Sequence, residues 1–207
     1  VIRAVNDGKG PDVLLLEEVE NIEVLQKINT DYLSDLGYEV VLIEDSYSNR
    51  GIDIGLLTRL PIIGKPKLKS LMVRQRKALY AQIDLGDSYK LSLYGVHLVA
   101  SAYDSAQKKR IKILQKLRGL LSKDAKEFTL VLGDLNFPKE LLERDKVINT
   151  YMRPQLTPVH LFCGDCKGTH YSFGKWNFLD MILTSENFYQ SGTPWTIDQK
   201  SFSVHNP

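Results

Sequence analysis

Short connections between neighbouring strand-like segments are the feature of this 207-residue sequence that most restricts its fold. Two such segments, Ala78–Leu85 and Lys90–Val99, are separated only by residues 86–89. Parallel neighbours need a crossover of about a dozen residues or more, so a purely parallel sheet does not fit these connections. The sequence therefore predicts an α/β fold in which mixed, mostly antiparallel β-sheets are covered by helices.

Helices are expected where apolar residues recur every three or four positions. Residues Asn21–Leu36 and Ser101–Lys123 have this spacing, and Gly37 fits the end of the first helix. The expected strands are Val13–Leu16, Glu39–Ile43, Ile52–Thr58, Ala78–Leu85, Lys90–Val99, Phe128–Leu132 and Leu179–Thr184. No internal repeat, linker or low-complexity segment interrupts this order, so we expect one domain over residues 1–207.

The composition is that of an ordinary globular protein and restricts function only weakly. Charged residues make up 25% of the chain and the formal net charge is +2, so the overall charge argues neither for nor against a nucleic-acid partner. No apolar run approaches the roughly 20 residues that cross a bilayer, so we expect no membrane span. The sequence starts at Val1 rather than Met, so it leaves the compartment open.

Polar residues follow directly on the apolar strand Phe128–Leu132. Gly133 allows a tight turn, and Asp134 and Asn136 lie on the same side if the strand continues through them. A carboxylate beside an amide can orient a water molecule and hold a phosphoryl oxygen or a metal ion. The alternative is a structural turn in which Asn136 caps a helix ahead of Pro138.

Four further acidic or basic residues stand at the ends of apolar strands or within them. Glu17 and Glu18 follow strand 13–16 and are the hard oxygen ligands that magnesium prefers, although such acids also complement the N-terminus of a following helix. His97 near the end of strand 90–99 is either a hydrogen-bonded core residue or a catalyst. Asp180 interrupts an apolar strand, so it needs a partner, either a histidine or a structural salt bridge to Arg or Lys.

Together and in this order, the segments resemble the endonuclease/exonuclease/phosphatase superfamily, which includes deoxyribonuclease I. The similar segments are PDVLLLEEVEN at 11–21, RGIDIGLLTRLPI at 50–62, YGVHL at 94–98, GDLNF at 133–137 and KWNFLDMILTS at 175–185. The resemblance implies a four-layer α/β sandwich of two facing sheets with helices outside. It also implies a magnesium-dependent phosphoesterase of nuclease type.

The resemblance also implies a role for each matching residue. Glu18 is implied as the ligand of a Mg²⁺ ion, for which Mn²⁺ is a substitute. Asp134 and Asn136 are implied to orient the nucleophilic water and contact the phosphate. His97 is implied to stabilise the phosphoryl oxygens or to act as an acid, and Asp180 to orient a second, general-base histidine.

The sequence departs from the family pattern at three places. Glu17 stands where the family usually has Gln, which adds negative charge beside the metal. The family's first strand carries a catalytic Asn, and the surroundings of Asn6 do not match it. The family ends in a Ser-Asp-His segment, and His205 lacks the matching neighbours, so we assign it no role. We therefore expect a domain over 1–207 that is incomplete at both ends.

Substrate contacts are expected from residues beside the site. Arg50 and Arg76 fall on or near loops next to the expected cleft, where guanidinium groups match phosphate oxygens. Trp176 is a candidate to stack on a base, although a single aromatic residue is more commonly a packing residue. The basic residues within 108–123 are better explained as the solvated face of an outer helix.

A second metal site is suggested by the spacing of His160, Cys163, Cys166 and His170, which fits a structural tetrahedral Zn²⁺ site. The alternatives are a disulfide between the two cysteines or two free thiols on a loop.

The leading function is hydrolysis of phosphodiester bonds in DNA or RNA. A phosphomonoesterase or sphingomyelinase activity on the same fold is the first alternative, since fold does not determine substrate. A non-catalytic binding protein that retains the fold is the alternative from another class. We expect a nucleic-acid substrate and a monomer, and no feature of the sequence indicates a protein partner.

Overall fold

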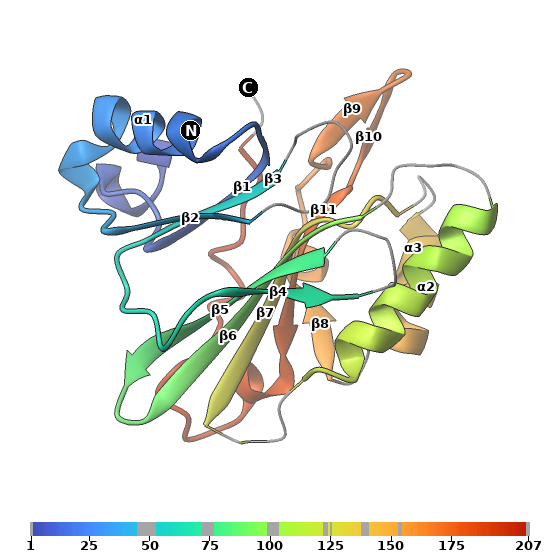
Figure 1. Cartoon of the computed structure of the whole chain (residues 1–207). Helices are drawn as coiled ribbons and strands as arrows, with labels where there is room; N and C mark the ends of the chain where they lie inside the picture. The colour runs from blue at the N-terminus through green and yellow to red at the C-terminus, as the bar shows by residue number, and fades with distance from the viewer. Residues whose placement is uncertain are drawn as a thin grey trace.

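The computed structural model describes residues 2–44, 53–71, 77–98, 104–121, 124, 126–137, 141–152 and 155–205. Its strands form three sheets (Figure 1). The first is a three-stranded sheet in the order β1–β3–β2, and these strands are Val13–Val19, Asp53–Thr58 and Val40–Glu44. All pairs described in it are antiparallel, so the expectation of two mixed sheets is wrong for this one.

The second sheet has six strands in the order β4–β5–β6–β7–β11–β8. In that order the strands are Lys67–Ser70, Lys77–Gly86, Tyr89–His97, Glu127–Asp134, Asp180–Ser185 and Leu156–Pro158. β6 and β7 pair in parallel, and helix α2 (Asp104–Arg118) lies in the crossover between them. The other described pairs are antiparallel, which confirms the predicted mixed α/β character for this sheet.

Several short elements have no counterpart among the expected ones. They are β4, β8, helix α3 (Leu141–Tyr151) and a two-stranded sheet formed by β9 (His170–Ser172) and β10 (Lys175–Asn177). Strands of three residues carry no periodic signal of their own, because their stability comes from pairing and packing rather than from local sequence.

The first long helix is shorter than its apolar pattern. α1 spans Ile22–Tyr32 and begins at Asn21, whose side chain accepts a hydrogen bond from the Val24 amide at 2.9 Å. The chain leaves the helix at Leu33 and makes a 3₁₀ turn over Ser34–Leu36. No helix of the described residues is long and apolar enough to cross a membrane.

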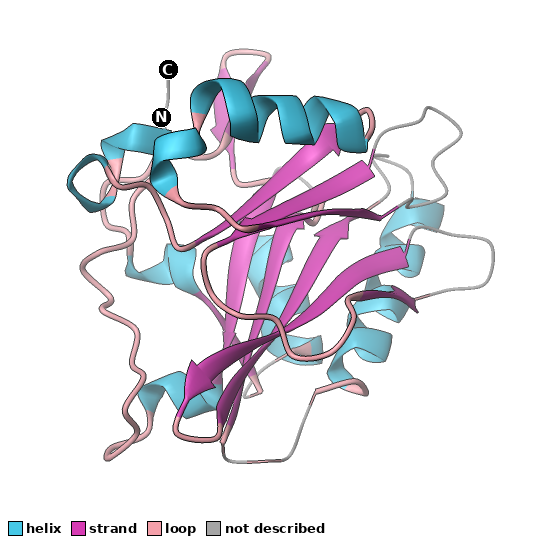
Figure 2. Ribbon diagram, turned by 60° about the vertical axis from the view of Figure 1, so that its left-hand side comes forward, coloured by secondary structure: helices cyan, strands magenta, loops and turns pink. Residues whose placement is uncertain are grey.

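Strand β6 connects two hydrophobic cores because both of its faces are buried. Tyr94 and Val96 pack in a core with helices α2 and α3, whereas Leu93 packs in a second core with Ile54 of β3. A third core lies between α1 and the three-stranded sheet and includes Leu25 and Leu57. Figure 2 shows helices on either side of the sheets, as these three cores require.

Gly95 of β6 marks a close approach of the two larger sheets. A Cβ atom added there would lie 2.7 Å from Leu15 Cδ1 of β1 and 3.1 Å from Ile54 Cγ2 of β3. The absence of a side chain therefore lets β1 pack against β6, which positions the end of β1 near the ends of β6 and β7.

Replacing Gly95 by valine should lower the free energy of unfolding by about 1–3 kcal/mol, since the larger side chain must displace Leu15 and Ile54. Urea denaturation of the variant measures this loss. Adding Leu15→Ala removes the nearest obstructing atoms, so the double variant should be less destabilised than the sum of the single variants. Strictly additive effects would show that the two positions are not in contact.

Candidate active site

Three of the candidate residues lie side by side across the six-stranded sheet. His97 of β6 is the register partner of Asp134 in β7, and Asp134 is in turn the partner of Asp180 in β11. All three stand at ends of their strands, on the same edge of the sheet. His97 is 5% exposed, and its Nε2 lies 3.7 Å from Asp134 Oδ2. This distance is too long for a hydrogen bond but allows a charge interaction when the imidazole is protonated.

The acidic end of β1 enters the site through a β-bulge. Glu17 pairs with Ile54 and Val19 with Asp53, so Glu18 is the extra residue, and its φ is +59°. A positive φ is uncommon for residues other than glycine and is found more often at functional sites. The bulge places both Glu17 and Glu18 on the wall of one cavity.

A hydrogen bond joins β1 to β7 at this point. Glu17 Oε1 accepts it from the backbone amide of Asp134 at 2.7 Å. Gly133 makes the contact feasible, because its φ is +130° and an added Cβ would lie 2.1 Å from Val96 O and 2.7 Å from Glu17 Oε1. Sequence reasoning assigned Gly133 to a turn and did not identify Glu17 as its neighbour.

Asp134 and Asn136 meet through a turn rather than along a continued strand. β7 ends at Asp134, and Asn136 has a φ of +48°. The backbone amide of Asn136 donates a hydrogen bond to Asp134 Oδ1 at 2.7 Å. The side-chain Nδ2 of Asn136 donates two more, to Leu98 O at 2.9 Å and to Asp134 Oδ2 at 2.5 Å. Both Nδ2 hydrogens are therefore used within the protein, and the side-chain Oδ1 is the atom that Asn136 can offer to a ligand.

These side chains surround a cavity of about 460 Å³. Its lining residues are Glu17, Glu18, His97, Asp134, Asn136, Thr169, His170, Leu179 and Asp180. The residues that the resemblance implied as catalytic or as the Mg²⁺ ligand thus all line this cavity, and they come from β1, β6, β7 with the turn that follows it, and β11. Thr169 and His170 are additional, and sequence reasoning considered His170 only as a zinc ligand.

Thr169 shapes the start of β11. Its Oγ1 accepts hydrogen bonds from the amides of Leu179 and Asp180, each at 3.1 Å, and its own amide donates to Asn177 O at 2.8 Å. A side chain that accepts from two successive amides holds the strand end in one position. Thr169 precedes the segment 175–185 that resembles the family, and this proximity in the sequence is the signal that could have identified it.

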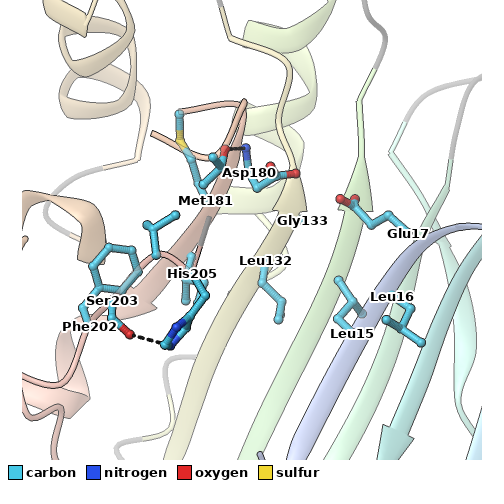
Figure 3. A pocket seen from close by; sticks show the side chains of 13 residues that line it. Leu15, Leu16, Glu17, Leu132, Gly133, Asp180, Met181, Phe202, Ser203 and His205 are labelled. Atoms are coloured by element: carbon cyan, nitrogen blue, oxygen red, sulfur yellow. Dashed lines mark hydrogen bonds between the residues drawn. The ribbon is translucent and has the colours of Figure 1, made fainter. Parts of the chain in front are cut away.

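A second cavity of about 560 Å³ adjoins the first and is lined by Leu15, Glu17, Gly133, Asp180, Met181 and His205, among others. Figure 3 shows the carboxylates of Glu17 and Asp180 pointing toward one another, with Gly133 between them. His205 lies on the wall of this cavity, and its Nε2 is 3.2 Å from Ser203 Oγ. In the sequence, Ser203 and His205 flank Val204, so the Asp between Ser and His in the family's terminal segment is absent here.

The carboxylates create an excess of negative charge. Burial, together with the carboxylates of Asp134 and Asp180, raises the pKa of Glu17 to about 8. A bound cation would relieve this repulsion, and carboxylate and amide oxygens are ligands that Mg²⁺ accepts. No three His, Cys, Asp or Glu side chains of the described ranges enclose a metal ion by themselves. A magnesium ion commonly takes only one or two ligands from protein carboxylates and the others from water and phosphate, so the oxygen donors present are of the type that it accepts.

A buried cation lies behind the site. Arg110 of α2 is 2% exposed, and its guanidinium carbon lies 6.0 Å from the centre of the Phe137 ring. Burial lowers the pKa of Arg110, and the negative charge of Asp134 acts in the opposite direction. The interpretation of the basic helix as wholly solvated is therefore wrong at Arg110, because the charge of Asp134 offsets part of the cost of burying it.

The expected zinc site is not formed. Cys163 and Cys166 are joined by a disulfide, which leaves no thiolate to bind zinc. His160 is buried and stacks on Phe178 with ring centroids 5.2 Å apart, whereas His170 is exposed and lines the cavity beside His97 and Asp134. The two histidines thus have separate surroundings, and of the three alternatives the structure contains the disulfide.

The expected substrate contacts have different outcomes. Arg50 and Arg76 lie outside the residues that the structure describes. Trp176 of β10 lines a neighbouring cleft of about 660 Å³ rather than the cavity that His97 and Asp134 line. Its ring centroid lies 5.2 Å from that of Tyr171, its partner on β9.

The raised pKa of Glu17 predicts a pH-dependent stability in metal-free protein. The folded state holds the Glu17 proton up to about pH 8, whereas the unfolded state releases it near pH 4.5, so stability falls as pH rises through this window. Glu17→Gln should raise the melting temperature at pH 8 and have little effect near pH 5, since glutamine resembles the protonated acid. Melting curves of both proteins across pH, with chelator present, measure this, and an equal shift at both pH values would contradict it.

Neither protein-family models nor curated proteins match the sequence. Solved structures match the fold. The endonuclease/exonuclease/phosphatase from Beutenbergia cavernae superimposes with a TM-score of 0.64 at 14% identity, over 89% of this chain and 58% of that protein. TDP2 from D. rerio in complex with a single-strand DNA product gives 0.62 at 19% identity, over 84% of this chain and 71% of that protein.

The catalytic domain of human Nocturnin with a bound sulfate anion gives a TM-score of 0.60 at 19% identity, over 85% of this chain and 70% of that domain. This chain spans less than two thirds of the Beutenbergia cavernae protein. The superpositions establish the fold, whereas sequence identities this low leave the substrate and the activity open. The resemblance seen in the sequence is nevertheless confirmed at that level: the chain has the endonuclease/exonuclease/phosphatase, or DNase I-like, fold.

Proposed function

We propose that this chain is a Mg²⁺-dependent phosphodiesterase that hydrolyses DNA or RNA. The observation that carries the proposal is the single cavity on which Glu18, His97, Asp134, Asn136 and Asp180 converge from four strands. The fold supports this proposal, since TDP2 of D. rerio shares the fold and its crystal structure is of a complex with a single-strand DNA product. We also propose the four-layer sandwich that the resemblance implies, and the three separate cores support this layering.

The reaction is attack of water on phosphorus. A bond forms between the water oxygen and phosphorus while the water gives up a proton to a base, the bond to the ester oxygen breaks, and the leaving oxygen takes a proton. Glu18, with Glu17 beside it, would hold the divalent cation, and Mn²⁺ can replace Mg²⁺ there. The bound cation supplies positive charge to the phosphate and to the leaving oxygen.

Asp134 and Asn136 are the residues that orient the water. The Asp134 carboxylate is held by two hydrogen bonds from Asn136, so its position is well determined. Because both Nδ2 hydrogens of Asn136 are used, its Oδ1 is an acceptor and suits a water proton better than a phosphate oxygen. We therefore propose that Asn136 acts on the water rather than as a donor to the phosphate.

His97 and Asp180 lie on either side of Asp134. His97 Nε2 lies 3.7 Å from Asp134 Oδ2, and a protonated imidazole at this position can donate to a phosphoryl oxygen. Asp180 shares the adjoining cavity with His205, and we propose that it orients a histidine by accepting from the imidazole.

Nicking of supercoiled plasmid with Mg²⁺, and its loss on adding chelator, tests the proposed activity. His97→Ala should reduce the rate by about 10²–10⁴-fold, the usual contribution of a positioned acid or base. Lys116→Ala changes an exposed residue of α2 and serves as the control. Melting curves establish that each variant is folded.

No nicking by folded, Mg²⁺-loaded wild-type protein would contradict the nuclease proposal. Assays with phosphomonoesters and sphingomyelin would then decide between the remaining activities of this fold. Nicking that persists in His97→Ala would remove His97 from the mechanism while leaving the activity itself in place.

A further inference from the structure

The tip of the β9–β10 hairpin carries an aromatic residue in an unfavourable setting. Phe173 and Gly174 form the two-residue connection, and their φ angles are +48° and +74°. Turns of this kind favour Asn, Asp and Gly, because a large side chain at positive φ is strained. Phe173 is also 93% exposed, so it contributes almost nothing to the core. Neither backbone preference nor burial explains a phenylalanine at this position.

The hairpin is directly connected to the catalytic cavity. His170, the first residue of β9, lines that cavity, and Thr169 just before it holds the start of β11. Figure 1 shows the hairpin extending beyond the end of the six-stranded sheet. A molecule bound to the hairpin would therefore lie next to residues that line the cavity.

Aromatic surface continues along one face of the hairpin. Tyr171 and Trp176 are cross-strand partners whose rings are tilted by 52° to each other, and Tyr171 is 59% exposed. Their shared face leads from the exposed tip to the neighbouring cleft, which Trp176 lines. The hairpin thus presents two exposed rings in succession and a third that is partly buried.

The charges around the hairpin favour an anionic ligand. Lys167 and Lys200 line the cleft beside Trp176, together with Asp165, and Lys175 is exposed on β10. The catalytic cavity itself carries carboxylates, which repel phosphate. Lysines next to the aromatic face would therefore supply the attraction that brings a phosphate chain to the site.

We propose that the β9–β10 hairpin binds single-stranded nucleic acid, with bases stacked on Phe173 and Tyr171 and phosphates paired with the neighbouring lysines. Exposed rings beside cations are the combination that recognises an unpaired strand. The cleft favours a strand over a lipid bilayer, because a flat surface cannot enter it to contact Trp176. The inference rests on the proposed function and specifies how its substrate is held.

Binding of a fluorescent oligothymidine to the full chain, measured by anisotropy with chelator present, tests this inference. Phe173→Asn and Tyr171→Ser should each weaken binding by about tenfold or more, the loss expected from one stacked base. Asparagine tolerates positive φ, so Phe173→Asn should melt at the wild-type temperature or above it. Tyr32→Ser removes a ring that is 69% exposed on α1 and should leave binding unchanged.

Affinity that is unchanged in both hairpin variants would overturn the inference, and so would an equal loss in Tyr32→Ser. Binding of the same variants to phosphatidylcholine–phosphatidylserine vesicles is the second measurement. If Phe173→Asn and Tyr171→Ser weaken vesicle binding but not oligothymidine binding, the hairpin binds a membrane surface instead. Hydrolysis of bis(p-nitrophenyl) phosphate by wild-type protein tests catalysis separately, because this small diester has no nucleobase. Failure of that hydrolysis counts against the proposed function, whereas unchanged oligothymidine affinity in the variants counts against the hairpin.

Discussion

The hydrogen bond from the Asp134 amide to the Glu17 carboxylate is the contact on which the site depends. It joins the end of β1 in the three-stranded sheet to the end of β7 in the six-stranded sheet. Only glycine at position 133 leaves room for it, since a Cβ there would collide with Val96 O and Glu17 Oε1. Gly95 permits the same close approach further along β6. Glu17 and Asp134, one from each sheet, therefore come together because Gly133 and Gly95 have no side chains.

That meeting has an electrostatic cost. Glu17 is largely buried beside two other carboxylates, and its pKa of about 8 expresses first the burial of the carboxyl group and then the repulsion from Asp134 and Asp180. A domain is stable by only about 5–15 kcal/mol, so a repulsive cluster requires well-packed surroundings. Three hydrophobic cores surround the sheets, and Arg110 provides a buried positive charge behind Asp134. Tight packing and strained residues such as Glu18 and Asn136 thus occur at the same place.

The elements nearest the cavity are also the least regular. The segment between β8 and β11 contains the disulfide and the β9–β10 hairpin. It also contains Thr169, whose hydroxyl accepts a hydrogen bond from the Leu179 amide. Such segments vary readily while the strands keep their positions, because they contribute little to the cores. A phosphoesterase fold can therefore keep one arrangement of carboxylates and change its substrate through the surrounding segments.

The sequence by itself determined the alternation of strands and helices, the mixed sheet and the positions of His97 and Asp134 at strand ends, because hydrophobic periodicity and turn residues are local signals. It left open whether Asn136 continues a strand or lies in a turn, and it placed Asp180 inside a strand, whereas Asn136 lies in a turn and Asp180 begins β11. Only the tertiary structure decided that Glu17 contacts Asp134, that Arg110 is buried and that Cys163 bonds to Cys166 rather than to zinc. These outcomes depend on how the sheets pack and on which groups are desolvated. Both are properties of residues far apart in the chain, and no local pattern of side chains encodes them.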